Sequence, residues 1–223
     1  MGKRLSIVLT GAALLSGSKN AALPEKDIDG TIFLVNRQHV ISEQYVPEPL
    51  RKTQVHGMSQ SMREDAAAAL EELFQAAQAD GIKLSSVSGY RSYSKQSLLY
   101  DRKTKRTGSE TEADKLVARP GASEHQLGLA MDLATRNSST LSEKFGSTPE
   151  GQWVYANCQR FGFIVRYLKG YEDVTGYSFE PWHIRYVGPE HAEAIAASGL
   201  PFETYLSGWK LELYDYLLHH AMN

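Results

Sequence analysis

Two short segments of the chain carry the residue types that a mononuclear zinc hydrolase requires. Residues 123–132 read SEHQLGLAMD, and residues 180–183 read EPWH. Within them, His125, Asp132 and His183 offer two imidazoles and one carboxylate. Three protein ligands that leave a fourth position for water are typical of a catalytic rather than a structural zinc site. Glu180 is then a further carboxylate, placed to act as a general base.

The first segment predicts a strand that is preceded by a bend. In residues 127–133, large apolar residues alternate with two small residues and Asp132, so one strand face would be core and the other nearly bare except for its carboxylate. His125 and Asp132 are an odd number of residues apart, which would send them to opposite faces of a straight strand. We therefore expect His125 to lie before the strand, in a bend.

The second segment predicts a strand rather than a helix. Pro181 disfavours helical dihedral angles at Glu180, so this is not the motif that carries two zinc-binding histidines on one helix. Residues 182–187 are rich in aromatic and β-branched side chains and read as a strand. Trp182 is expected to pack beside the neighbouring ligand. A structural alternative for Glu180 is an ion pair with Arg185.

Three motifs occur in order along the chain. The first, beginning at Ser88, is Ser-Gly-Tyr-Arg-Ser-x-x-x-Gln; the second is Ser-x-His-x-x-Gly-x-Ala-x-Asp; the third is Glu-x-x-His with Trp before the His. Together they resemble the VanY-type zinc D-alanyl-D-alanine carboxypeptidases, over roughly residues 82–187. The ordered set is far more specific than any one motif.

The resemblance implies a role for each matching residue. One zinc ion (Zn²⁺) per chain would be held by His125, Asp132 and His183. Glu180 would be the catalytic base. The substrate site would be lined by Arg91, Gln96 and Ser123. Arg91 would face the scissile carbonyl or the terminal carboxylate and take part in catalysis, because a guanidinium donates bidentately to carboxylate oxygens.

The resemblance also implies the substrate class, which is peptidoglycan stem peptides that end in D-alanine. The same scaffold serves L,D-carboxypeptidases and cell-wall endopeptidases, and these activities remain alternatives. A zinc-bearing binding module without catalysis is a further alternative. Glu180 argues against that module, because binding alone needs no base.

Composition excludes other classes of function. The 223 residues are 42% hydrophobic and 22% charged, as in an ordinary globular chain with one sizeable core. A net charge of −2 and a pI of about 6.4 give no electrostatic case for binding nucleic acid. Cys158 is the only cysteine, so no internal disulfide can form, and a zinc site must use histidine and carboxylate. We read the basic run at residues 102–106 as a solvated helix face.

Residues 1–22 predict an export signal or an N-terminal anchor. The chain begins MGKR, and the apolar stretch that follows, residues 5–15, is short for a membrane span. We expect an exported protein of the periplasm or cell envelope, with membrane contact only if this segment stays uncleaved. Residues 23–223 would form one catalytic domain that acts as a monomer.

The pattern of elements predicts an α+β single domain, in which a small, mostly antiparallel sheet carries the zinc site and is flanked by helices. A capping box at Ser61 predicts the start of the first helix. The expected helices are 61–81, 94–106, a short one from 109, 149–162, 189–198 and 201–220. The expected strands are 31–35, 82–87, 127–133, 163–167 and 182–187.

Overall fold

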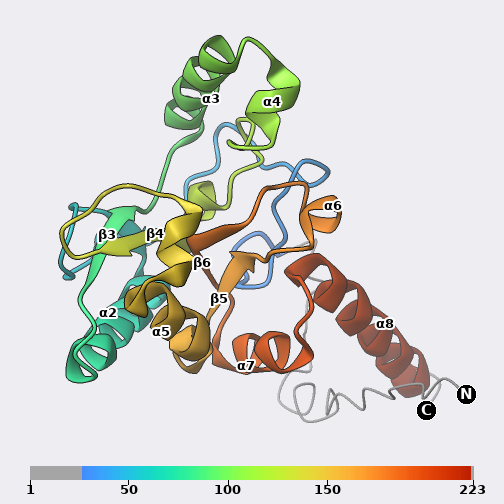
Figure 1. The fold of residues 1–223 in the computed structure, drawn as a ribbon. Coiled ribbons are helices and arrows are strands. Elements are labelled where there is room, and N and C mark those ends of the chain that lie inside the picture. Colours follow the sequence, from blue (N-terminus) through green and yellow to red (C-terminus); the bar gives the residue numbers. More distant parts are fainter. Residues whose placement is uncertain (1–26, 222–223) are drawn as a thin grey trace, which may run out of the picture.

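The computed structural model describes residues 27–221, which form a four-stranded sheet flanked by helices (Figure 1). Every neighbouring pair of strands in this sheet is antiparallel. The order across the sheet is β3 (Leu84–Ser88), β4 (Ala130–Thr135), β6 (Glu180–Tyr186) and β5 (Phe163–Tyr167). The predicted α+β class with a small antiparallel sheet is confirmed.

The register of the two central strands brings distant residues together. Asp132 on β4 lies opposite His183 on β6, and on its other side it pairs with Ser88 on β3. Opposite residues of antiparallel strands have their side chains on the same face, with Cβ atoms about 4.5–5.5 Å apart. Glu180 pairs with Tyr167 at the end of β5. The sheet thus joins residues that are 51 positions apart in the chain, Asp132 and His183.

Helices cover the lower side of the sheet as drawn in Figure 1, where α2 (Glu64–Ala79), α5 (Pro149–Asn157) and α7 (Pro189–Ser198) lie together. The predicted apolar stripe of α2 faces the core, since Leu70, Leu73 and Ala77 are buried. Below the sheet, this core also receives apolar side chains of the strands, among them Leu129, Met131, Leu133, Phe163 and Ile184.

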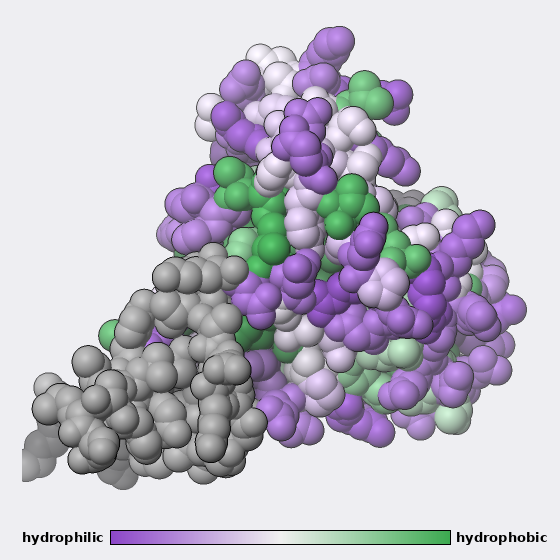
Figure 2. Space-filling view, turned by 180° about the vertical axis from the view of Figure 1, so that it is seen from behind, coloured by the Kyte–Doolittle hydropathy of each residue, from purple (hydrophilic) through white to green (hydrophobic). Residues whose placement is uncertain are grey.

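A projection stands on the other side, built from α3 (Tyr93–Thr107) and α4 (Glu110–Asp114). Ser92 caps α3, Gly108 in the left-handed region ends it, and Ser109 caps α4. Seen from behind, hydrophobic residues gather around the base of this projection, while hydrophilic residues cover most of the remaining surface (Figure 2). The helices predicted for this part of the chain are therefore present, with the first of them capped by Ser92.

The remaining elements connect these layers. In chain order they are the strands β1 (Leu50–Lys52) and β2 (Ser61–Arg63), the 3₁₀ helices η1 (Glu124–Leu127), η2 (Glu143–Ser147) and η3 (Cys158–Phe161), and the α-helices α6 (Glu172–Thr175) and α8 (Phe202–Ala221). Among residues 27–221, no helix combines the length and apolar character needed to cross a membrane. The predicted export signal, residues 1–22, lies outside the described part of the chain.

Two local predictions at the start of the chain are wrong. Ser61 does not cap α2, because residues Ser61–Arg63 pair with β1 and the helix begins only at Glu64. The strand expected at residues 31–35 is not formed. Instead, the carbonyl oxygens of Thr31 and Phe33 both accept hydrogen bonds from Nη2 of Arg185, so a side chain takes the place of a partner strand.

The strand that carries Asp132 starts later than predicted. Gly128 adopts a φ of +69°, which ends the 3₁₀ turn η1 and delays the strand until Ala130. The expectation that His125 precedes the strand in a bend is confirmed, because it lies in η1.

Candidate metal centre

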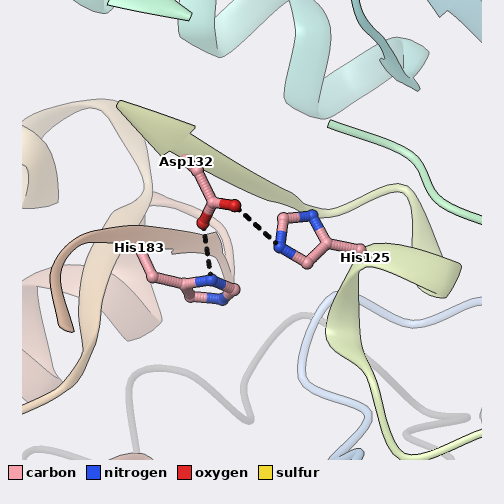
Figure 3. Close-up of side chains that lie close together, drawn as sticks. All are labelled: His125, Asp132 and His183. Atoms are coloured by element: carbon pink, nitrogen blue, oxygen red, sulfur yellow. Dashed lines mark hydrogen bonds and ion pairs between the residues drawn. The ribbon is translucent and has the colours of Figure 1, made fainter. Parts of the chain in front are cut away.

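Three side chains from three elements converge on one another, with Asp132 between the two histidines (Figure 3). His125 comes from η1, Asp132 from β4 and His183 from β6. His125 Nε2 lies 3.3 Å from Asp132 Oδ2, and His183 Nδ1 lies 3.0 Å from Asp132 Oδ1. All three side chains are buried. The structure therefore brings together the three residues that the sequence predicted as metal ligands.

A backbone carbonyl fixes the orientation of His125. Its Nδ1 lies 2.8 Å from the carbonyl oxygen of Gly89, which can only accept, so Nδ1 carries the proton and Nε2 offers its lone pair towards Asp132. Burial and the nearby Arg91 lower the pKa of His125. A neutral imidazole of this kind is ready to bind a metal ion through Nε2.

His183 lies between carboxylates. Its Nδ1 faces Asp132, and Glu180 Oε2 is 3.9 Å from the same nitrogen. Its Nε2 lies 3.5 Å from Glu124 Oε2. Burial alone would lower the pKa of His183, but hydrogen bonding to Asp132 and Glu124 outweighs it and raises the pKa to about 9. The acidic surroundings thus favour a positive charge at this point.

Glu180 stands beside the ligands without being held by them. Burial raises its pKa to about 7, while the positive charges of His183 and Arg91 oppose the rise. A carboxylate with a pKa near neutrality is suited to exchanging protons. The alternative of an ion pair with Arg185 is wrong, because Arg185 Nη1 donates to Glu124 Oε1 at 2.9 Å instead.

Arg91 is held over the site by two hydrogen bonds. Its Nη1 donates to Gln96 Oε1 at 2.8 Å, and its Nη2 donates to Ser88 Oγ at 2.8 Å. Nη2 also lies 3.8 Å from Asp132 Oδ2. Gln96 itself is fully buried, and its Nε2 donates to the carbonyl oxygen of Ala118. Gln96 therefore orients Arg91 and does not line the cleft.

A cleft of about 350 Å³ opens above the three ligands. Besides the ligands, its walls include Arg91, Glu180 and Ser123 of the predicted site. Trp182 both lines the cleft and packs against the core. Its bracing of the neighbouring His183 stays a prediction. Lys103 and Tyr167 are among the wall residues that sequence reasoning missed. Lys103 belongs to the basic run that the sequence assigned to a solvated face.

Sequence reasoning also missed Glu124, which is completely buried. Its Oε1 accepts hydrogen bonds from Arg166 Nε at 2.8 Å and from Arg185 Nη1 at 2.9 Å. The available signal was an arginine within each of two strands that are mostly buried, Arg166 in β5 and Arg185 in β6. A buried charge needs a partner, so such arginines predict a buried acid elsewhere.

The donor set fits zinc. Two neutral imidazole nitrogens and a carboxylate oxygen are typical zinc ligands, and ligand atoms around a tetrahedral zinc lie about 3.3 Å apart. Here one ligand atom from each residue can be chosen so that all lie within 4.8 Å of one another, and the nearest pairs are 3.0 and 3.3 Å apart. Three ligands at the floor of an open cleft leave a coordination position for water or substrate.

The fold and this site together define a metallopeptidase. The family model for VanY, D-alanyl-D-alanine carboxypeptidase, matches residues 59–189. The chain belongs to this VanY family of carboxypeptidases.

One curated relative and two solved structures support this family assignment. A putative carboxypeptidase of Bacillus subtilis, YodJ, is 42% identical over 184 residues, which cover 79% of this chain and 67% of the relative. The solved structure of the LD-carboxypeptidase LdcB is 43% identical, with a TM-score of 0.74 over 79% of this chain and 86% of that one. A VanY D,D-pentapeptidase solved in complex with Zn(II) is 38% identical, with a TM-score of 0.69 over 79% and 98% of the two chains.

Proposed function

We propose that this protein is a zinc-dependent carboxypeptidase that removes the C-terminal D-alanine from peptidoglycan stem peptides. The observation that carries the proposal is the convergence of His125, Asp132 and His183 below an open cleft, with Glu180 beside them and, among the described side chains, without an ion pair to arginine. Family membership supplies the substrate class.

The metal would be held through His125 Nε2, His183 Nδ1 and a carboxylate oxygen of Asp132. When bound, zinc supplies Lewis acidity, which polarises a substrate carbonyl and brings the pKa of water from about 15.7 towards 7. We propose one zinc ion per chain, since the described residues offer one such group of ligands.

Glu180 would act as the general base. Its pKa of about 7 allows it to accept a proton from the attacking water at neutral pH and to return that proton to the leaving amine. Arg91 would donate to the developing oxyanion or to the terminal carboxylate, because Ser88 and Gln96 hold its guanidinium at the cleft. Ser123, on the cleft wall, would contact the substrate.

The second candidate activity is that of an L,D-carboxypeptidase. The LdcB structure, an LD-carboxypeptidase, is as similar to this chain as the other relatives are, and the same catalytic set would serve both activities. Stem length and the chirality of the penultimate residue distinguish the two substrates.

We further propose export to the cell envelope, where peptidoglycan is accessible, with residues 1–22 as the signal or anchor. Fusion of residues 1–30 to a reporter that is active only outside the cytoplasm tests this proposal. Residence of the full-length protein in the cytoplasm would contradict it.

Incubation with defined muropeptides tests the activity. We expect release of free D-alanine from a pentapeptide stem, abolished by a chelator and restored by zinc. Release from a tetrapeptide stem alone would identify the L,D activity, and larger fragments would identify an endopeptidase. If zinc-loaded protein cleaves none of these substrates, the catalytic proposal is wrong and the binding module stands.

A further inference from the structure

A buried charge cluster lies beside the metal centre and reaches the cleft wall through Glu124. It consists of Glu124, Arg166, Arg185 and Glu203. Glu124 accepts from both arginines through Oε1. Arg166 also donates to both carboxylate oxygens of Glu203 on α8, at 2.9 and 2.6 Å. The two acids balance the two bases, so the cluster as a whole is neutral.

One oxygen of this cluster is directed at a metal ligand. Glu124 Oε2 is buried, and it lies 3.5 Å from His183 Nε2. His183 Nε2 is likewise buried, and within residues 27–221 neither of these two atoms has a hydrogen-bond partner. Two buried polar atoms that each lack another partner are costly unless they satisfy one another.

This pairing fixes the chemistry of the imidazole. Because a carboxylate can only accept, Glu124 requires the proton of neutral His183 to be on Nε2. Nδ1, which faces Asp132 at 3.0 Å, is then left with a lone pair for the metal. A carboxylate on the far side of a histidine ligand sets its tautomer and ring orientation and raises its basicity.

The two histidines are supported differently. His125 is oriented by the backbone carbonyl of Gly89, a neutral group that no side-chain substitution removes. His183 is oriented by a charged side chain that two arginines hold in place. Although burial opposes ionisation, Arg166 and Arg185 keep the pKa of Glu124 well below its usual range.

We infer that Glu124 is a positioning residue of the metal centre. It holds His183 with Nε2 protonated and Nδ1 turned towards the metal, while Arg166 and Arg185 hold Glu124 in place through their hydrogen bonds to Oε1. The inference rests on the proposed zinc site and goes beyond it, because Glu124 is neither a ligand nor the base in that proposal.

A purely structural role is the competing explanation, since Glu124 also neutralises two buried arginines. Glu203→Gln is the matched control, because it removes a carboxylate from the same cluster but leaves His183 untouched. Glu124→Gln and Glu124→Asp are the test variants. The aspartate keeps the charge beside the arginines and withdraws the oxygen from His183.

The primary measurement is the zinc dissociation constant, obtained by competition with a chromogenic chelator, beside the melting temperature of metal-free protein. We expect both Glu124 variants to bind zinc about 10- to 100-fold more weakly than the wild type. We expect Glu203→Gln to change the affinity less than about threefold while it still lowers the melting temperature. If Glu124→Gln does not fold, Glu124→Asp decides the question alone.

Nitrogen NMR of histidine-labelled, zinc-loaded protein gives a second readout. We expect His183 as the tautomer protonated at Nε2 in the wild type and a loss of this signature in Glu124→Asp. Folded Glu124 variants that bind zinc as tightly as Glu203→Gln would overturn the positioning role. Wild-type protein that binds no zinc would instead overturn the proposed function, so the two failures are distinguishable.

Discussion

At the scale of single residues, the site is a balance between burial and opposite charge. Burial raises the pKa of Glu180 to about 7, and the neighbouring Asp132 adds to this rise. His183 has its pKa raised to about 9 because hydrogen bonds to acids outweigh its burial. A base that is poised near neutrality beside a strongly acidic ligand set is what hydrolysis at neutral pH requires.

Substitution of the proposed base separates metal binding from catalysis. We expect Glu180→Ala to keep its zinc and its fold but to lose hydrolysis by about 10²- to 10⁴-fold, because both proton transfers depend on this carboxylate. His183→Ala is the control and should lose most of its zinc, since it removes a ligand. Metal analysis beside D-alanine release checks both. Loss of zinc from Glu180→Ala would make Glu180 a ligand.

Lys103, on the cleft wall, should influence how the activity depends on pH. The positive charge of Lys103 favours ionised Glu180 and so lowers the pKa of Glu180. In Lys103→Met this pKa should rise, and the acidic limb of the kcat/KM profile should move to higher pH. Activity at pH 6, relative to that at pH 8, should fall by roughly two- to threefold.

Lys105→Met is the matched control, because Lys105 is exposed on the same helix and does not line the cleft. The ratio of activity at the two pH values should be unchanged in this variant. An equal change in both variants would mean that overall charge, rather than the position of Lys103, sets the profile.

The grouping of His125, Asp132 and His183, with Glu180 beside them, could be predicted from sequence because each residue sits in a short, ordered motif. Glu124 could not be paired from sequence, although it is next to a ligand. Its partners Arg166 and Arg185 are 42 and 61 positions away, and only the strand arrangement brings them to it. Gln96 shows the same limit, since its position in a motif gave no sign that it contacts Arg91 rather than substrate.

At the scale of elements, the site depends on how the 3₁₀ turn with His125 passes into the strand with Asp132. Gly128 makes this change of direction with a φ of +69°. The strands were predictable because their side chains alternate, whereas Ser61 was misread because a local capping pattern competed with a tertiary strand pairing. Local propensity is a weak prior when another segment offers hydrogen-bond partners.

Gly128→Ala should therefore lower the free energy of unfolding more than an alanine at another glycine with positive φ. A Cβ atom at position 128 would lie 3.0 Å from both Arg63 N and Leu50 Cδ2. At Gly81, with a φ of +79°, it would meet nothing within 4 Å. We expect Gly81→Ala to cost about 1–2 kcal/mol from backbone strain alone, and Gly128→Ala roughly 1–3 kcal/mol more from crowding.

Urea unfolding of the metal-free variants measures both free energies of unfolding. The zinc dissociation constant should rise in Gly128→Ala alone, because only this glycine joins two metal ligands. Equal destabilisation of both variants would show that the contacts at Gly128 relax without cost.

At the scale of the whole molecule, the metal centre joins parts that are distant in sequence. The sheet order β3-β4-β6-β5 sets the ligand strands β4 and β6 at its centre. The buried charge cluster beside the ligands reaches Glu203 on α8 and the carbonyl oxygen of Thr31. The α+β class followed from the order of elements, but strand order and these contacts depend on pairings that no local pattern encodes.

Because the ligands come from three elements of one core, metal binding should stabilise the entire fold. An ion that binds only the folded state adds RT ln(1 + [L]/Kd), which is about 2.7 kcal/mol when free zinc is 100 times Kd. For a chain of this size, 1 kcal/mol shifts the melting temperature by about 2–4 °C. Removal of zinc with a chelator should therefore lower the melting temperature of the wild type by roughly 5–11 °C, as measured by calorimetry.

His183→Ala should show little of this drop, because it has already lost most of its affinity for zinc. A drop of the same size in that variant would mean that the chelator acts on another site, and the assignment of His125, Asp132 and His183 as the stabilising metal centre would then be wrong.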